Sequence, residues 1–249
     1  KILFEEYDVV YEDLREVLSK FISAYTHPEE MKSSYIYRGE ILPITRKAAL
    51  TSQISLICDE IFPDTPVINN EALNKNEPTV AAVNSRNKIT TALLRTELEP
   101  NLGFAGTSQE VSIMRNTLVR TGIVVEDNDM VHINMHPEDE LIRNMLTKIE
   151  SFVMQAKRDG SVNFAKIYEV LTSPENSIGL RRGLIPLYIA VVFHTYKHEI
   201  IIYDRFGQIS TTTDALLQIN ANPEGYTLHY LDWNPEKEQY IEGLSKVFE

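Results

Sequence analysis

The chain has 249 residues, of which 43% are hydrophobic, and carries a formal net charge of −12 at pH 7. Its length allows one or two domains with a sizeable core, and its acidic balance argues against a dedicated, high-affinity nucleic-acid binder, because contacts to phosphates supply much of that affinity. Cys58 is the only cysteine, which excludes an internal disulfide and a cysteine-based metal cluster. We therefore expect a reducing, cytoplasmic setting.

The first 78 residues are expected to form an N-terminal helical region. Apolar residues recur at helical spacing between positions 7 and 25. A second helix is predicted over 45–61, with Cys58 on its apolar side as a core thiol, and residues 35–42 can form a short hairpin between the two. The chain begins inside a helical pattern and without an initiator methionine, so we interpret it as part of a larger polypeptide. No signal peptide or membrane span is visible in it.

Residues 79–136 predict a first winged-helix-like unit. A helix is expected to follow Pro78, from 79 to about 98. Thr107 and Glu110 have the spacing of a capping box and are expected to begin a second helix, which ends at Gly122. Two strands, 123–126 and 130–133, then flank a turn at 127–129.

Residues 137–249 predict a second winged-helix-like unit with a C-terminal strand and helix. The expected elements are helices at 137–157, 163–171 and 184–193, strands at 199–204 and 208–212, a helix at 214–219, a strand at 226–231 and a helix at 235–249. The segment 184–193 is apolar on every side, with Pro186 in its first turn, so we expect a buried helix and not one that reads DNA. The predicted fold class is α+β, mainly helical, with small β-hairpins.

Motifs of catalysis are missing from the sequence. It contains no Gly-Lys pair, hence no P-loop, and no G-x-S-x-G nucleophile elbow. His194 and His198 have helical spacing, but no further metal ligands accompany them, and histidines are favoured at a helix C-terminus in any case. We therefore expect no catalytic residues, no metal and no cofactor in this chain.

Two groups of polar and basic residues are candidates for contact with nucleic acid. On the expected helix 107–121 the residues off the apolar stripe are Gln109, Ser112, Arg115, Asn116 and Arg120, whose side chains suit phosphates and base edges. The second group is the pair Arg181 and Arg182. Arg86 and Lys88 add to the positive balance of residues 81–120. Ordinary solvated faces, or loop residues paired with nearby acids, are the alternative interpretation of both groups.

Three segments taken together resemble a known class of proteins. They are PDTPVINNE (63–71) before a polar helix, LGFAG (102–106) before a capped helix and 121–124, and IGLRRGLIP (178–186). Their order resembles the region downstream of the ATPase core in large bacterial P-loop ATPases of antiphage-defence islands, including the BREX ATPases. The resemblance implies a winged-helix and helical accessory region. Its parent protein would couple nucleotide hydrolysis to the handling of nucleic acid or phage components.

The sequence thus favours a non-catalytic accessory region of a larger defence ATPase, serving assembly or contact with nucleic acid. Its expected partners are other parts of the parent ATPase, other defence-system subunits and, weakly, DNA or RNA, with no membrane. A winged-helix DNA-binding regulatory module is the main alternative, and a small hydrolase whose site has no recognisable motif is a third.

Overall fold

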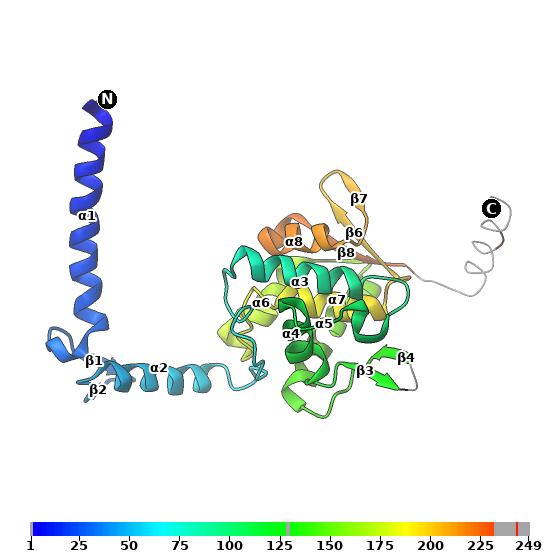
Figure 1. Ribbon diagram of the computed structural model, residues 1–249, viewed down its shortest axis with the longest axis horizontal. Coiled ribbons are helices and arrows are strands. Elements are labelled where there is room, and N and C mark those ends of the chain that lie inside the picture. The colour runs from blue at the N-terminus through cyan, green and yellow to red at the C-terminus, as the bar shows by residue number, and fades with distance from the viewer. Residues whose placement is uncertain (1, 128–129, 232–242, 244–249) are drawn as a thin grey trace. The chain divides into compact units, whose positions relative to one another are not determined.

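The computed structural model describes residues 2–127, 130–231 and 243, with the backbone alone for residues 2–6. The chain divides into two compact units, Lys1–Ile61 and Phe62–Glu249. Over the described residues it has eight α-helices and three small antiparallel sheets (Figure 1). The predicted mainly helical α+β fold is therefore confirmed.

The first unit consists of two helices joined by a hairpin. Its elements are α1 (Ile2–Thr26), a 3-10 turn (Pro28–Glu30), β1 (Tyr35–Tyr37), β2 (Glu40–Leu42) and α2 (Lys47–Ile61). The hairpin turns at Arg38 and Gly39, both with positive φ, which is the backbone of the tight two-residue turn that suits the twist of paired strands. From β1, Tyr37 donates its hydroxyl proton to Glu60 of α2, with 2.9 Å between the oxygens. The predicted helices and hairpin are confirmed.

The second unit holds the remaining elements. They are α3 (Val80–Leu93), α4 (Gln109–Met114), a π-helical segment (Arg115–Val119), β3 (Val124–Asp127), β4 (Met130–Ile133), α5 (Glu140–Asp159), β5 (Ser161–Asn163), α6 (Phe164–Thr172), α7 (Ile185–Thr195), β6 (Ile200–Asp204), β7 (Gly207–Ile209), α8 (Thr213–Ala221) and β8 (Thr227–Tyr230). The helix expected to reach 98 ends at Leu93. The helix expected at 235–249 and the turn at 128–129 lie outside the described residues.

Helix α7 is the centre of the second unit. Every residue from Ile185 to Phe193 is buried, and the helix packs against α3, α5 and α8 (Figure 1). Exposing any side of a helix that is apolar all round would leave apolar surface in water, which is unfavourable. The surrounding elements therefore enclose it. Its one phenol, Tyr188, donates to the carbonyl of Thr117 at 3.2 Å, which satisfies the buried hydroxyl. The prediction of a buried helix here is confirmed.

The strand order of the largest sheet differs from what the predicted winged-helix-like unit at 137–249 implies. Its strand order is β5-β8-β6-β7, all antiparallel. Strand β8 thus lies between β5 and β6, while β7, the return strand of the β6 hairpin, lies at the edge. The order of elements from α5 to β7 matches a winged helix, but the winged-helix arrangement is not confirmed. The added central strand is β8. The sequence predicted it as a C-terminal strand but did not indicate its pairing partners.

One hydrophobic core runs through the second unit. It extends from Ile68 to Leu228 and includes residues on both sides of positions 78 and 136, where the sequence suggested boundaries. The compact units meet at 61/62. A finer division into 79–136 and 137–249 stays a prediction.

Candidate functional site

The predicted nucleic-acid helix consists of α4 and the π-helical segment that continues it. Val111, Met114 and Leu118 are buried as expected. The helix starts later than predicted, because Ser108 is the N-cap and its side chain makes no capping hydrogen bond. The capping box at Thr107 is therefore wrong: Glu110 instead bonds Lys88 of α3, with 2.9 Å between carboxylate and ammonium.

The wide π turn sets where the last polar residues of this helix point. The backbone N–H of Arg120 donates to the backbone carbonyl of Arg115, five residues back, at 2.9 Å. Gly122 then ends the segment with φ +69°, a conformation that favours glycine, as predicted. Arg120 is exposed and its guanidinium donates to the side-chain oxygen of Asn116 at 2.9 Å.

The outer face of this helix is polar, but it is not an uncompensated positive patch. Ser112 and Arg115 are exposed, whereas Gln109 already accepts a hydrogen bond from Ser85 of α3 at 3.1 Å. Beside Arg120 lies a depression of about 500 Å³ that Glu138 and Asp139 also line. A phosphate bound next to Arg120 would meet those two carboxylates, which weakens its attraction.

Arg181 and Arg182 do not join this face. Arg181 is exposed, and the guanidinium of Arg182 lies over the ring of Tyr168 in α6, 5.4 Å from its centre. The backbone N–H of Arg182 donates to Asn76 at 3.3 Å. Among the described residues, no hydrogen bond or ion pair connects this pair to α4. The two predicted groups therefore have different neighbours in the structure.

Arg86, which adds to the positive balance of residues 81–120, is buried. Only 2% of it is exposed. Its Nη1 donates to the carbonyl of Gly183 at 3.0 Å, and its Nε has no partner among the described residues. Burial lowers the pKa of Arg86. This guanidinium connects α3 to the loop before α7, and it is not available to a phosphate.

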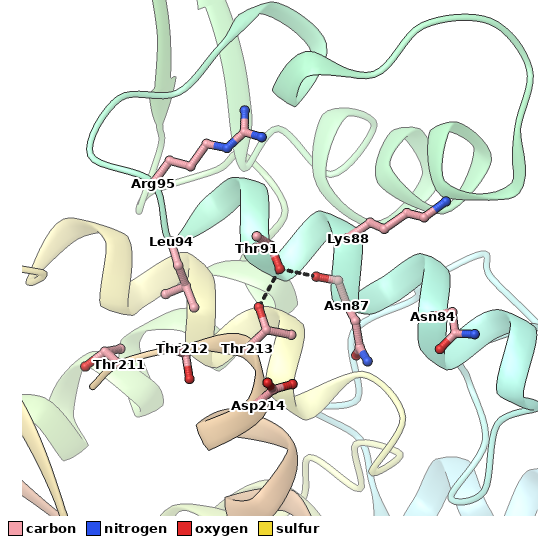
Figure 2. Close-up of a pocket in the computed structure, with 10 residues that line it drawn as sticks. All are labelled: Asn84, Asn87, Lys88, Thr91, Leu94, Arg95, Thr211, Thr212, Thr213 and Asp214. Atoms are coloured by element: carbon pink, nitrogen blue, oxygen red, sulfur yellow. Dashed lines mark hydrogen bonds between the residues drawn. The ribbon is translucent and has the colours of Figure 1, made fainter. Parts of the chain in front are cut away.

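A further depression lies between α3 and the segment that leads into α8 (Figure 2). It has a volume of about 680 Å³, and the hydroxyls of Thr91 and Thr213 bond across it at 2.7 Å. Its two cations, Lys88 and Arg95, are already paired with glutamates. The other lining residues are mostly amides and hydroxyls: Asn84, Asn87, Leu94, Thr211, Thr212 and Asp214. Such a lining suits hydrogen bonds to neutral groups and gives no excess positive charge to an anion.

His194 and Cys58, which the sequence singled out, differ in their surroundings. His194 donates from Nδ1 to the carbonyl of Leu93 at 2.7 Å, and burial lowers its pKa. In the part of the chain that the structure describes, no group of three or more His, Cys, Asp or Glu could hold a metal ion. Cys58 is exposed on α2, so the prediction of a core thiol is wrong.

The first unit exposes an unusual amount of apolar surface. No residue of α2 is buried. On α1, every large apolar side chain from Tyr7 onward is at least 49% exposed. We use the name α1 stripe for nine of them: Tyr7, Val10, Tyr11, Leu14, Val17, Leu18, Phe21, Ile22 and Tyr25. The periodicity predicted this amphipathic helix, and the structure adds that no element of residues 7–61 covers its apolar side.

The chain was compared with protein-family models, curated proteins and solved structures. No family model, curated protein or solved structure matches the chain. The resemblance to defence ATPases stays a prediction. Over the described residues, no helix combines the length and apolar character needed to cross a membrane.

Proposed function

We propose that this chain is a non-catalytic accessory region that serves assembly, making protein contacts through its first unit. The resemblance to bacterial antiphage-defence ATPases supplies the expected parent protein. The observation that carries the proposal is the α1 stripe, whose nine members are between 49% and 69% exposed. Contiguous apolar surface of this kind is typical of sites that bind other proteins.

The contrast between the two units strengthens this proposal. The second unit encloses its apolar helix α7 completely, so the sequence is able to specify a dry core. The stripe on α1 has the same helical regularity and yet lies open within its own unit. A surface that regular, left uncovered by residues 7–61, is best explained by a partner that covers it.

Thiol labelling tests whether the stripe is open in the isolated chain. In a Cys58→Ser background, Leu14→Cys on the stripe and Ser19→Cys outside it are reacted with a maleimide at high dilution. We expect both to react at the same rate within about threefold, because both positions are exposed. If the thiol at position 14 reacts more than about tenfold more slowly in monomeric protein, the chain covers its own stripe and the proposal fails.

Contact with DNA or RNA through α4 is the second candidate function. It is favoured by Ser112 and Arg115, which are exposed on one helix, and by the lack of an ion pair for Arg115 among the described residues. Affinity should be weak, with Kd about 10⁻⁴ to 10⁻⁶ M, and should fall steeply with salt. Titration of labelled duplex at low salt should show binding by the wild type and none by Arg115→Glu with Arg120→Glu. Equal binding by both proteins would mean that another face is used.

A further inference from the structure

Two depressions on the second unit adjoin each other. The first, between α3 and the segment that leads into α8, has a volume of about 680 Å³ (Figure 2). The second has a volume of about 210 Å³ and lies beside Phe193, Lys197 and His198, around the end of α7. Leu94 and Thr211 line both depressions, so the two form one continuous groove. We use the name α3 groove for it.

The α3 groove runs along one side of α3. The residues that this helix and its C-cap contribute, from Asn84 to Leu94, have the three- and four-residue spacing of one helix face. Ten residues of helix are about 15 Å long, which equals about five residues of an extended chain at about 3.3 Å each. Asn84, Lys88 and Thr91 are exposed, so the groove is open to solvent along this length. An open groove suits an elongated ligand better than a small molecule, which usually needs a site that encloses most of its surface.

Part of the opposite wall is extended backbone with free hydrogen-bonding groups. Strand β7 is at the edge of the largest sheet, and residues 210–212 continue from it toward α8. Among the described residues, neither the backbone N–H nor the carbonyl of Thr211 has a hydrogen-bond partner. Free backbone groups along the edge of a sheet are where an extended peptide can add as a further strand. This wall therefore offers the groups with which one polypeptide pairs with another.

The side chains of the α3 groove add groups of the same kind. Asn84 makes no hydrogen bond within the part of the chain that the structure describes, and its amide carries both donors and an acceptor, as a peptide unit does. The hydroxyl of Thr212 accepts from the backbone N–H of Ala215 at 3.2 Å and still has a proton to donate. The lining thus matches neutral groups that both donate and accept hydrogen bonds.

The charges in the α3 groove cancel. Counting histidine as neutral, the charged side chains that line it are Lys88, Arg95, Lys197 and Asp214. Lys88 and Arg95 are each paired with a glutamate, and Lys197 donates to the carbonyl of Thr96. With the two glutamates, three positive charges lie among three negative charges, so no cation is left for the phosphates of a nucleic acid. The aromatic residue in this lining, Phe193, is buried and offers no face on which a base could stack.

We propose that the α3 groove binds an extended segment of another protein, about five residues long, chiefly through the backbone of that segment. The free backbone groups of Thr211 and the amide of Asn84 carry this assignment, because both match peptide units. The segment is uncharged where it lies in the groove, since every cation of the groove already has a partner. This contact belongs to the second unit and does not depend on the α1 stripe.

Peptide selection on the full chain tests the proposal. A phage library of random seven-residue peptides is first depleted on the double variant Asn84→Leu with Thr91→Val, and the remainder is selected on the wild type. Both positions are exposed, so the variant keeps the fold, which its melting curve checks. We expect a synthetic copy of a selected peptide to bind the wild type with Kd about 1–100 μM. It should bind the double variant at least about tenfold more weakly, because groups that hydrogen-bond to it are lost. Asn74→Leu makes the same exchange at an exposed position outside the groove and should bind as the wild type does.

Methylation of the peptide backbone shows which groups are recognised. N-methylation of one peptide bond at a time should weaken binding by about tenfold or more at alternate positions, because alternate N–H groups of an extended segment face the same edge. Equal binding by all the methylated peptides would overturn the proposal, and so would a library that holds no binder of the wild type after depletion. Labelled single-stranded DNA and RNA of about ten nucleotides are titrated alongside. Binding of either one that the double variant abolishes would make the groove a nucleic-acid site and would also refute the proposal.

Discussion

A single added methyl group at Gly183 should strongly destabilise the second unit. A Cβ at this position would lie 2.2 Å from the carbonyl oxygen of Leu73, 2.6 Å from that of Lys75 and 2.6 Å from Cγ of Pro78. Two of these atoms belong to the backbone, so no side-chain rotation relieves the overlap. The segment 73–78 and the loop before α7 would have to separate.

The magnitude follows from what that separation breaks. The N–H of Gly183 donates to Lys75 at 2.9 Å, and its carbonyl accepts from buried Arg86 at 3.0 Å. Overpacking costs about 1–3 kcal/mol. The neutral hydrogen bond contributes about 0.5–1.5 kcal/mol and the charged one about 1.5–3 kcal/mol. Together Gly183→Ala should cost about 3–7 kcal/mol, a large part of the 5–15 kcal/mol that folded domains usually have.

Thermal unfolding followed by circular dichroism measures this. Gly183→Ala should lower Tm by about 6–28 °C, since 1 kcal/mol shifts Tm by about 2–4 °C in a unit of this size. Gly106→Ala is the matched control: its φ is +80° and a Cβ there meets nothing within 4 Å, so it loses only about 1–2 kcal/mol to backbone strain. If Gly183→Ala melts no lower than Gly106→Ala, the close crossing at Gly183 is not a determinant of stability and the reasoning fails.

Three further predictions use other parts of the second unit. Ile189→Asp should give insoluble or unfolded protein, because Ile189 is 1% exposed and an unpaired buried charge costs several kcal/mol; a soluble variant with a normal melting curve would contradict this. Stability should fall as the pH drops below about 6.5, because burial lowers the pKa of His194 and the unfolded chain then takes up the proton first. Denaturant titrations from neutral to mildly acidic pH should show a smaller fall in the free energy of unfolding for His194→Asn than for the wild type. An equal dependence on pH in the two proteins would contradict this prediction. The purified chain should not hydrolyse ATP, and phosphate release that follows the protein through a second column would refute this.

The elements of the fold were largely predictable because their signals are local. The apolar run before His194 predicted α7, and the turn residues after Gly122 predicted the β3–β4 hairpin. The pairing of β8 between β5 and β6 was not predictable, because partner choice between distant strands depends on packing and not on residues near the strand.

The burial of Arg86 could have been predicted from its spacing along the helix, although arginine is usually exposed. It lies four residues after Ala82 and three before Ile89, both buried, so helical spacing already placed it on the inner face of α3. Spacing identifies which residues share a face, but not whether anything covers that face. The same limit explains why Cys58 was expected in a core and is exposed on α2.

The position of β8 in the sheet has a consequence for synthesis on the ribosome. Strands β5 and β6 are made first, yet each pairs with a strand that leaves the exit tunnel only after α8. Until Tyr230 has emerged, the nascent chain holds two strand edges without their native neighbour, open to wrong pairing. The second unit is therefore expected to complete its folding late in translation. Chains truncated before residue 227 should aggregate, even though they contain every helix from α3 to α8.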